Sequence, residues 1–343
     1  MITLDFDFMR ENTERKSHYF KTHRKASTFI FVAMLFFVLP HLGQAEQYPT
    51  KPIRFVVYTN PGGLIDVTIR KLAQIIEESL ESEGISTPVI VENKSGAGGL
   101  VAIQYVLRQP ADGHTIFALT SSVISKAVQS KRTQQLHKLA MLVRLVDDYE
   151  CLIVKRQGRY LKLDDLKNVM REPESRVLWV GPAIGGTDHL FAVRFWNAIG
   201  SRGTWIPYKS GGEAIGALLG GHADVYVGNP QDVMGRNDLQ ILAVASPKRL
   251  PQFPAAVTFE ESGVGELTGS SLWRGLAIHH DTPNSIREQI LGLIKKSTES
   301  VVWRNFIEQS GAEVIFESGK PFDDLVALQI ERDAKLLNTL PRG

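Results

Sequence analysis

Residues 53–76 read IRFVVYTNPGGLIDVTIRKLAQII, and this stretch sets the architecture of the chain. The β-branched and aromatic run at 53–58 is typical of a buried strand. Apolar residues then recur at helical spacing, at Ile65, Ile69, Leu72, Ala73, Ile76 and Leu80. The chain therefore begins with a strand, a glycine turn and a helix, which together form a βα unit.

The same alternation continues along the chain. Strand-like runs lie near 89–91, 115–119, 151–154, 177–180, 204–206, 225–227, 240–245 and 273–278, with helical patterns between them. One long helical pattern runs from Pro283 through Phe306, and a last helix is expected at about 323–340. Alternating strands and helices predict mostly parallel sheets, and 343 residues suit two lobes.

The first 45 residues differ from the rest and indicate a secretory signal peptide. Basic residues at 21–25 precede an uncharged, largely apolar run at 26–39, and small residues end at Ala45. The run is shorter than the roughly 20 residues that a helix needs to cross a bilayer. We expect export to the periplasm with cleavage after Ala45. The alternative is a retained N-terminal membrane anchor.

The charges of the remaining chain balance. The 39 Lys and Arg and 37 Asp and Glu include six and four in the first 45 residues, which leaves 33 of each sign. A nucleic-acid partner would require a clustered excess of Lys and Arg, so none is expected. Cys151 is the only cysteine, so no internal disulfide can form, and its apolar neighbours predict a core position.

The turn at residues 60–66 places glycines at the start of the first helix. Gly62 and Gly63 let backbone N–H groups approach a ligand, and a helix N-terminus attracts anions. Asp66 lies in the first helical turn, where a carboxylate accepts N–H groups. Capping is therefore favoured over direct ligand contact for this side chain.

Two later glycine turns also precede helices. The sequence SGAGG at 95–99 resembles the start of a dinucleotide fingerprint, but the third glycine and the ribose-binding acidic residue are missing, so a structural turn explains it equally well. In the later turn, Gly185 and Gly186 precede Thr187, whose hydroxyl can cap the helix or donate to a carboxylate. Two such loops from different lobes would clamp one ligand.

Signatures of catalysis are missing. The chain has no Gly-x-Ser-x-Gly elbow, no Walker loop and no His-Glu-x-x-His zinc helix. His279-His280-Asp281 is the only dense candidate for a metal site, but adjacent side chains at a strand end diverge, so a solvated loop is favoured. We expect a binding protein with no metal and no cofactor, and not an enzyme.

Several motifs in fixed order carry a family resemblance. They are YPTKPIR at 48–54, PGG at 61–63 followed by Asp66, VENK at 91–94 before GAGG at 96–99, ADGHT at 111–115, HL at 189–190, PYKSGG at 207–212, ALLGGHADV at 217–225 and LAVAS at 242–246. Through them, residues 46–343 resemble, nearly end to end, the tripartite tricarboxylate transporter substrate-binding proteins, also called Bug-type periplasmic receptors.

The resemblance implies the fold of a type II periplasmic binding protein, which has two α/β lobes, a hinge and a ligand cleft between the lobes. Residues 1–45 are then the signal peptide and 46–146 the first part of lobe 1. Residues 147–271 form lobe 2, and 272–343 return to lobe 1. Lobe closure over the solute is the expected mechanism.

The resemblance also implies a site that holds one ligand carboxylate by backbone N–H groups and water. The matching positions are Asn60, Pro61, Gly62, Gly63 and Asp66 in the first turn, and Gly185, Gly186 and Thr187 in the later loop. The first turn departs from the common Ala-Gly-Gly-Gly-Thr-Asp pattern, because Pro61, Leu64 and Ile65 replace a small residue, a glycine and a hydroxyl. We hypothesise a ligand with an apolar body beside its carboxylate.

Arg274, between Trp273 and Gly275 on the return strand, supplies charge to a second carboxylate if it faces the cleft; otherwise it is a surface arginine. The implied partners are the small and large membrane subunits of the transporter, and we expect a monomer. Two alternatives stay open at this point: a receptor that reports to a sensor kinase, and a periplasmic enzyme on the same scaffold.

Overall fold

The computed structural model describes residues 48–339. The predicted signal peptide therefore lies outside the described residues. Contacts divide the chain after Thr50, and the fold below belongs to the unit that begins at Lys51. No helix in the described part of the chain is long and apolar enough to cross a membrane.

The unit contains two six-stranded sheets. The first has the order β12-β4-β11-β3-β1-β2 and contains β1 (Ile53–Val57), β2 (Val89–Asn93), β3 (Thr115–Thr120), β4 (Leu139–Asp147), β11 (Arg274–His279) and β12 (Glu313–Ser318). The second has the order β10-β9-β5-β8-β6-β7 and contains β5 (Cys151–Lys155), β6 (Leu178–Pro182), β7 (Thr204–Tyr208), β8 (Val225–Gly228), β9 (Leu239–Val244) and β10 (Val257–Thr258). These sheets are the cores of two α/β lobes. The lobe boundaries at 147 and 272 stay predictions.

The expectation of mostly parallel sheets is wrong in part. β1, β2 and β3 pair in parallel, as do β6, β7 and β8, but β11 lies antiparallel between β3 and β4. β5 lies antiparallel between β8 and β9 in the same way. Both inserted strands adjoin the segments where the chain passes between the sheets. They therefore run against their neighbours, which a local sequence pattern does not show.

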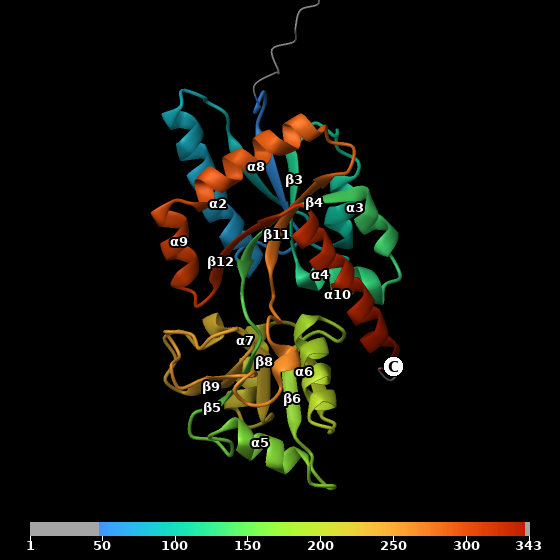
Figure 1. The fold of residues 1–343 in the computed structure, drawn as a ribbon, viewed down its shortest axis with the longest axis vertical. Helices are drawn as coiled ribbons and strands as arrows, with labels where there is room; N and C mark the ends of the chain where they lie inside the picture. Colours follow the sequence, from blue (N-terminus) through green and yellow to red (C-terminus); the bar gives the residue numbers. More distant parts are fainter. Residues whose placement is uncertain (1–47, 340–343) are drawn as a thin grey trace, which may run out of the picture. The chain divides into compact units, whose positions relative to one another are not determined.

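Helices cover both faces of the first sheet. They are α2 (Leu64–Ser82), α8 (Asn284–Thr298) and α9 (Val301–Glu308) on one face, and α3 (Leu100–Val106), α4 (Ser121–Gln129) and α10 (Lys320–Thr339) on the other (Figure 1). Sequence predicts one helix through Phe306, but the structure has two. Ser300 ends the continuity because its Oγ accepts the N–H of Trp303 and caps α9.

The second sheet is also covered on both faces, which its central strand shows most clearly. Side chains alternate along a strand, so Leu152 and Val154 of β5 enter one core with α5 (Leu163–Met170) and α6 (Thr187–Ala198). Cys151 and Ile153 enter the opposite core with α7 (Gly211–Leu219). Cys151 is fully buried, which confirms its predicted core position.

The turn before β3 is held tightly under α8. Gly113 has φ +80°, and a Cβ added there would lie 2.5 Å from Ile286 Cγ2 and 2.9 Å from Ile290 Cδ1. Glycine is required at this position by both the backbone conformation and the close approach of α8.

Replacing Gly113 with alanine should therefore destabilise the protein more than Gly200→Ala does. Gly200 also has positive φ, at +65°, but nothing lies within 4 Å of its added Cβ. We expect Gly200→Ala to cost about 1–2 kcal/mol of conformational strain, and Gly113→Ala to cost about 1–3 kcal/mol more through overpacking. Urea unfolding measures both, and equal losses would show that α8 does not press on this turn.

Candidate functional site

The first glycine turn is held by the side chain that follows it. Asp66 Oδ2 accepts the backbone N–H of Gly62 at 2.8 Å and Arg70 Nε at 3.0 Å. Asp66 Oδ1 accepts Asn93 Nδ2 at 2.8 Å, and the same amide donates to Thr59 O at 2.9 Å. Asp66 is 1% exposed, so its carboxylate is occupied in fixing the turn. Its backbone partner Gly62 precedes the N-cap residue Gly63, so Asp66 connects the turn to α2 and does not cap the N–H groups of the helix itself.

The charge state of Asp66 follows from the same contacts. Burial alone would raise the pKa of this carboxyl, but the hydrogen bonds from Arg70, Gly62 and Asn93 outweigh it and leave the pKa below its ordinary value. Asp66 therefore stays ionised at neutral pH. The remaining residues of the turn, Asn60 and Pro61, are exposed.

The SGAGG turn packs as a structural element. Gly96, Ala97, Gly98 and Gly99 all have positive φ, and a Cβ on Gly98 would lie 2.6 Å from Lys126 Cγ of α4. The glycines let the chain pass close to α4 before α3 begins. This geometry favours the structural interpretation of the turn.

The later glycine loop is fixed by aromatic residues beneath it. Gly185 has φ +75° and donates its N–H to His189 Nδ1 at 3.0 Å. The His189 ring stacks on Trp205 with centroids 4.8 Å apart, and Trp205 Nε1 donates to Ala183 O at 2.8 Å. Burial lowers the pKa of His189 to about 4, so its ring is neutral and able to accept at neutral pH.

The two sheets contribute helix N-termini that meet each other. Thr187 Oγ1, at the start of α6, lies 3.1 Å from Ser122 Oγ and 3.3 Å from Ser121 Oγ, at the start of α4. Gln129 of α4 also donates to Ile184 O at 3.0 Å. Since β1 and β3 are neighbours in one sheet, the N-termini of α2 and α4 leave the same sheet edge. Three helix N-termini thus face the junction between the sheets.

Sequence reasoning placed Gly185, Gly186 and Thr187 there but missed Ser121 and Ser122. The available signal was the Thr120-Ser121-Ser122 run directly after a strand, since these residues are preferred helix caps. Thr120 Oγ1 does accept the N–H of Ser122, at 3.3 Å, and it lies 2.7 Å from the hydroxyl of Tyr58.

Arg274 is buried and not a surface residue. It is 2% exposed, forms an ion pair with Asp148, and donates from Nη1 to Thr68 Oγ1 at 3.3 Å. Its charge is thus already matched within the protein. Binding of a second ligand carboxylate by Arg274 stays a prediction.

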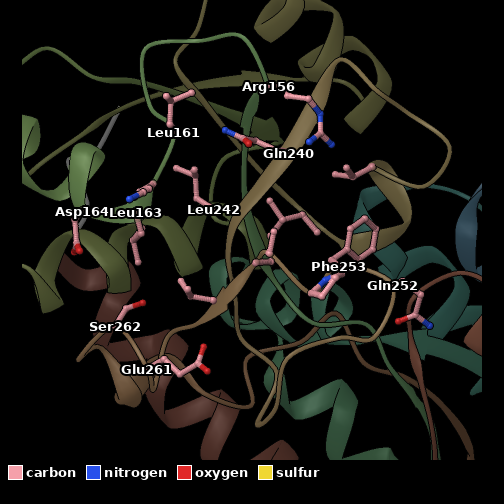
Figure 2. A pocket seen from close by; sticks show the side chains of 17 residues that line it. Arg156, Leu161, Leu163, Asp164, Gln240, Leu242, Gln252, Phe253, Glu261 and Ser262 are labelled. Carbon is pink, nitrogen blue, oxygen red and sulfur yellow. The ribbon is translucent and has the colours of Figure 1, made fainter.

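A separate pocket lies in the second lobe (Figure 2). Its volume is about 480 Å³, and its wall includes Leu161, Leu163, Leu242 and Phe253. Its polar groups are partly engaged by their own neighbours, because Arg156 Nε donates to Asn237 O at 3.0 Å and Gln240 Nε2 to Tyr160 O at 3.2 Å. None of the sequence-predicted site residues lines this pocket. The junction of the glycine loops, which the sequence predicts as the site, is thus distinct from this pocket and stays a prediction.

Comparison with known proteins identifies the family. Residues 70–341 match the family described as "Tripartite tricarboxylate transporter family receptor". The chain belongs to this family. Its receptors are periplasmic solute-binding proteins, which agrees with the two-lobe fold and with the resemblance found in the sequence. BugT of Bordetella pertussis is 30% identical over 251 residues, which cover 71% of this chain and 75% of BugT.

Solved structures of similar proteins show the same fold. MatC from Rhodopseudomonas palustris, with bound malate, has a TM-score of 0.69 at 20% identity and covers 84% of this chain and 100% of MatC. Rpa4515 of R. palustris, with adipate, has a TM-score of 0.70 at 22% identity, with 85% and 98% covered. The family receptor described here therefore shares its two-lobe α/β architecture with proteins that hold dicarboxylates.

Asp66→Ala should loosen the first turn. The change leaves the N–H of Gly62 and the amide of Asn93 without their acceptor, so we expect a loss of about 1–3 kcal/mol in urea unfolding at pH 7. Because the folded-state pKa of Asp66 is lowered, its contribution exists above the unfolded-state pKa and disappears as pH falls through the folded-state value.

Asp165→Ala is the matched control. Asp165 accepts the backbone N–H groups of Leu161 and Lys162 at the start of α5, but it is exposed. We expect about 1 kcal/mol for this cap. An Asp66→Ala variant that loses no more stability than the control would mean that the buried network does not fix the turn.

Proposed function

We propose that the chain is an exported periplasmic receptor that captures a small carboxylate-bearing solute between the first glycine turn and the Gly185–Thr187 loop. It then delivers the solute to the small and large membrane subunits of a tripartite transporter. The observation that carries the proposal is the contact of Thr187 with Ser121 and Ser122, which brings helix N-termini from both sheets together.

Helix N-termini suit a carboxylate for two physical reasons. Their first N–H groups have no partner inside the helix, and the helix dipole is positive there. A carboxylate that receives four or five charge-assisted hydrogen bonds, each worth about 1.5–3 kcal/mol, can reach the roughly 8 kcal/mol of micromolar binding after ordering costs. Binding of a carboxylate by these hydrogen bonds needs no arginine clamp, which is consistent with the pairing of Arg274 to Asp148.

The solute class is a carboxylate with an apolar body. Malate and adipate in structurally similar proteins support the carboxylate. Pro61 removes one backbone donor from the first turn, and Leu64 is half-buried directly after the glycines. Both features reduce the polar contacts that this turn offers, which favours an apolar portion next to it.

Capture requires movement of one lobe against the other. We propose lobe 1 at 46–146 and 272–343 and lobe 2 at 147–271, with closure biased by the solute. Two segments near 148 and 272 connect them, and the backbone N–H of Leu272 donates to Asp148 O at 2.8 Å. The receptor acts as a monomer and performs no catalysis.

Carboxylate binding should raise the melting temperature of the receptor. The protein, freed of bound solute by unfolding and refolding, is screened against mono-, di- and tricarboxylates and aromatic acids. A ligand at 100 times its Kd adds about 2.7 kcal/mol, which shifts Tm by several degrees. The absence of any shift with carboxylates would contradict the proposed solute class.

Thr187→Val tests the site itself. The change keeps the side-chain shape but removes a hydroxyl from the junction, so we expect binding of the best carboxylate to weaken about tenfold or more. Thr204→Val, at the exposed start of β7, is the matched control and should bind as the unmodified chain does. Equal affinities for the two variants would place the ligand elsewhere.

Export should leave Glu46 as the first residue. The intact mass and N-terminal sequence of protein recovered from the periplasm measure this directly. A protein that retains residues 1–45 and stays with the membrane fraction would support the anchor and contradict cleavage.

A further inference from the structure

The junction between the two sheets contains more acidic than basic side chains. Asp148 and Glu150 lie on the segment that leaves β4 for β5, and both are 0% exposed. Asp188 follows Thr187 at the start of α6, and Asp232 ends the short helix η3 (Pro230–Asp232). These four carboxyls influence one another electrostatically. A site proposed to hold an anion thus has an acidic floor.

The cations near this floor are largely occupied. Arg274 pairs with Asp148, and Arg332 on α10 lies 3.3 Å from Asp333. Arg194 on α6 donates to Ser270 Oγ at 2.7 Å and to Glu266 O at 2.6 Å. Asp232 is compensated differently, because it accepts the Tyr226 hydroxyl and the N–H of Asn229, both at 2.9 Å. Of this group, Glu150 remains without a hydrogen-bond partner among the described residues.

Glu150 is the most isolated of the group. Among residues 48–339, neither of its carboxylate oxygens has a hydrogen-bond partner. It lines a cavity of about 20 Å³, together with Thr187, Arg194 and Asp333. That volume holds roughly one water. A buried carboxylate with no direct donor carries a large desolvation cost, which a carboxyl avoids by binding a proton.

We propose that Glu150 binds a proton at neutral pH, and that this proton reduces the negative charge of the floor of the junction and so helps to admit an anionic solute. The second half of this statement rests on the proposed function, whereas the proton site itself does not. Glu150 lines the same small cavity as Thr187, which places the proton site beside the predicted ligand loop.

The electrostatic surroundings agree with this assignment. Burial, followed by the charges of Asp188, Asp148 and Asp232, raises the pKa of Glu150 well above its ordinary value, and Arg194 only partly opposes this. Asp188 also acts across the junction: burial raises the pKa of the Tyr58 phenol on the first sheet, and the Asp188 charge adds to that rise.

The competing arrangement is an ionised Glu150 bridged to Arg194 by a water in the cavity. Arg194 stays charged at neutral pH, because burial lowers its pKa only to about 10. The two arrangements predict opposite effects of pH and of a neutral side chain at position 150. Stability measurements without ligand can therefore distinguish them.

The first experiment follows urea unfolding of the full protein from pH 5.5 to pH 8.5. Raised folded-state pKa values mean that the folded chain holds more protons than the unfolded chain, so stability is full below the unfolded-state pKa and is lost as pH rises through the folded-state value. The folding equilibrium constant should fall about tenfold per pH unit for each proton released. Glu150→Gln should remove one such factor and be more stable than the unmodified protein at pH 8.5.

Glu266→Gln is the matched control. The Glu266 side chain is exposed near Arg194, and only its main-chain oxygen accepts the guanidinium. This variant should keep the pH slope of the unmodified protein. If Glu150→Gln loses stability at pH 8.5, Glu150 is ionised and bridged to Arg194, and the proton site is overturned. An unchanged slope in Glu150→Gln would overturn it equally.

The second experiment measures malate and adipate binding over the same pH range. We expect affinity to weaken as pH rises towards 8.5, and Glu150→Gln to abolish most of that dependence, since its amide stays neutral. Weakening that persists in Glu150→Gln would overturn the link to the solute. If neither acid binds at any pH, nor any other carboxylate tested, the proposed function fails and so does the link to the solute, whereas the unfolding data decide the proton site alone.

Discussion

The buried ion pair of Arg274 with Asp148 joins the two segments along which the chain passes between the sheets. Asp148 lies on the outgoing segment and Arg274 begins the returning strand β11, so the pair connects the two chain crossings. The crossings are also joined by backbone bonds from Leu272 to Asp148 and from Glu150 to Ser270. Arg274 contacts Thr68 of α2 as well, which connects the crossings to the helix that carries the first glycine turn. Removing one partner of such a pair would leave an uncompensated buried charge.

That arrangement brings together the loops that we propose as one site, although they lie far apart in the sequence. The first turn is held by Asp66 and Asn93 on the first sheet, and the later loop is held by His189 and Trp205 on the second. Each loop is thus fixed within its own lobe before any solute binds. Since ordering costs reduce affinity, loops fixed in advance leave only the movement between lobes to be driven by the solute.

The sequence predicted the features that depend on local chemistry. Glycine turns after strands and the core position of Cys151 follow from residue type and spacing, and the structure agrees. β4 was missed because LAMLVRLVD at 139–147 shows no regular alternation of apolar and polar residues, although most of the strand is buried. The edge position of β12 and the antiparallel direction of β5 and β11 depend on their partner strands, which a local sequence pattern does not identify.

The sequence could not predict the acidic floor for a related reason. Asp147, Asp148 and Glu150 look like solvated residues, because residues 46–343 contain equal numbers of each charge, and only the chain crossing buries them. Once they are buried, each negative charge needs a cation, a set of donors or a proton. Arg274 forms an ion pair with Asp148, and Tyr226 and Asn229 donate hydrogen bonds to Asp232. Glu150 has no hydrogen-bond partner among the described residues, so a proton is left to neutralise its charge. An anion receptor that keeps such carboxyls next to its ligand loop links its affinity to pH, because the same desolvation that favours contact with the solute also favours the neutral acid.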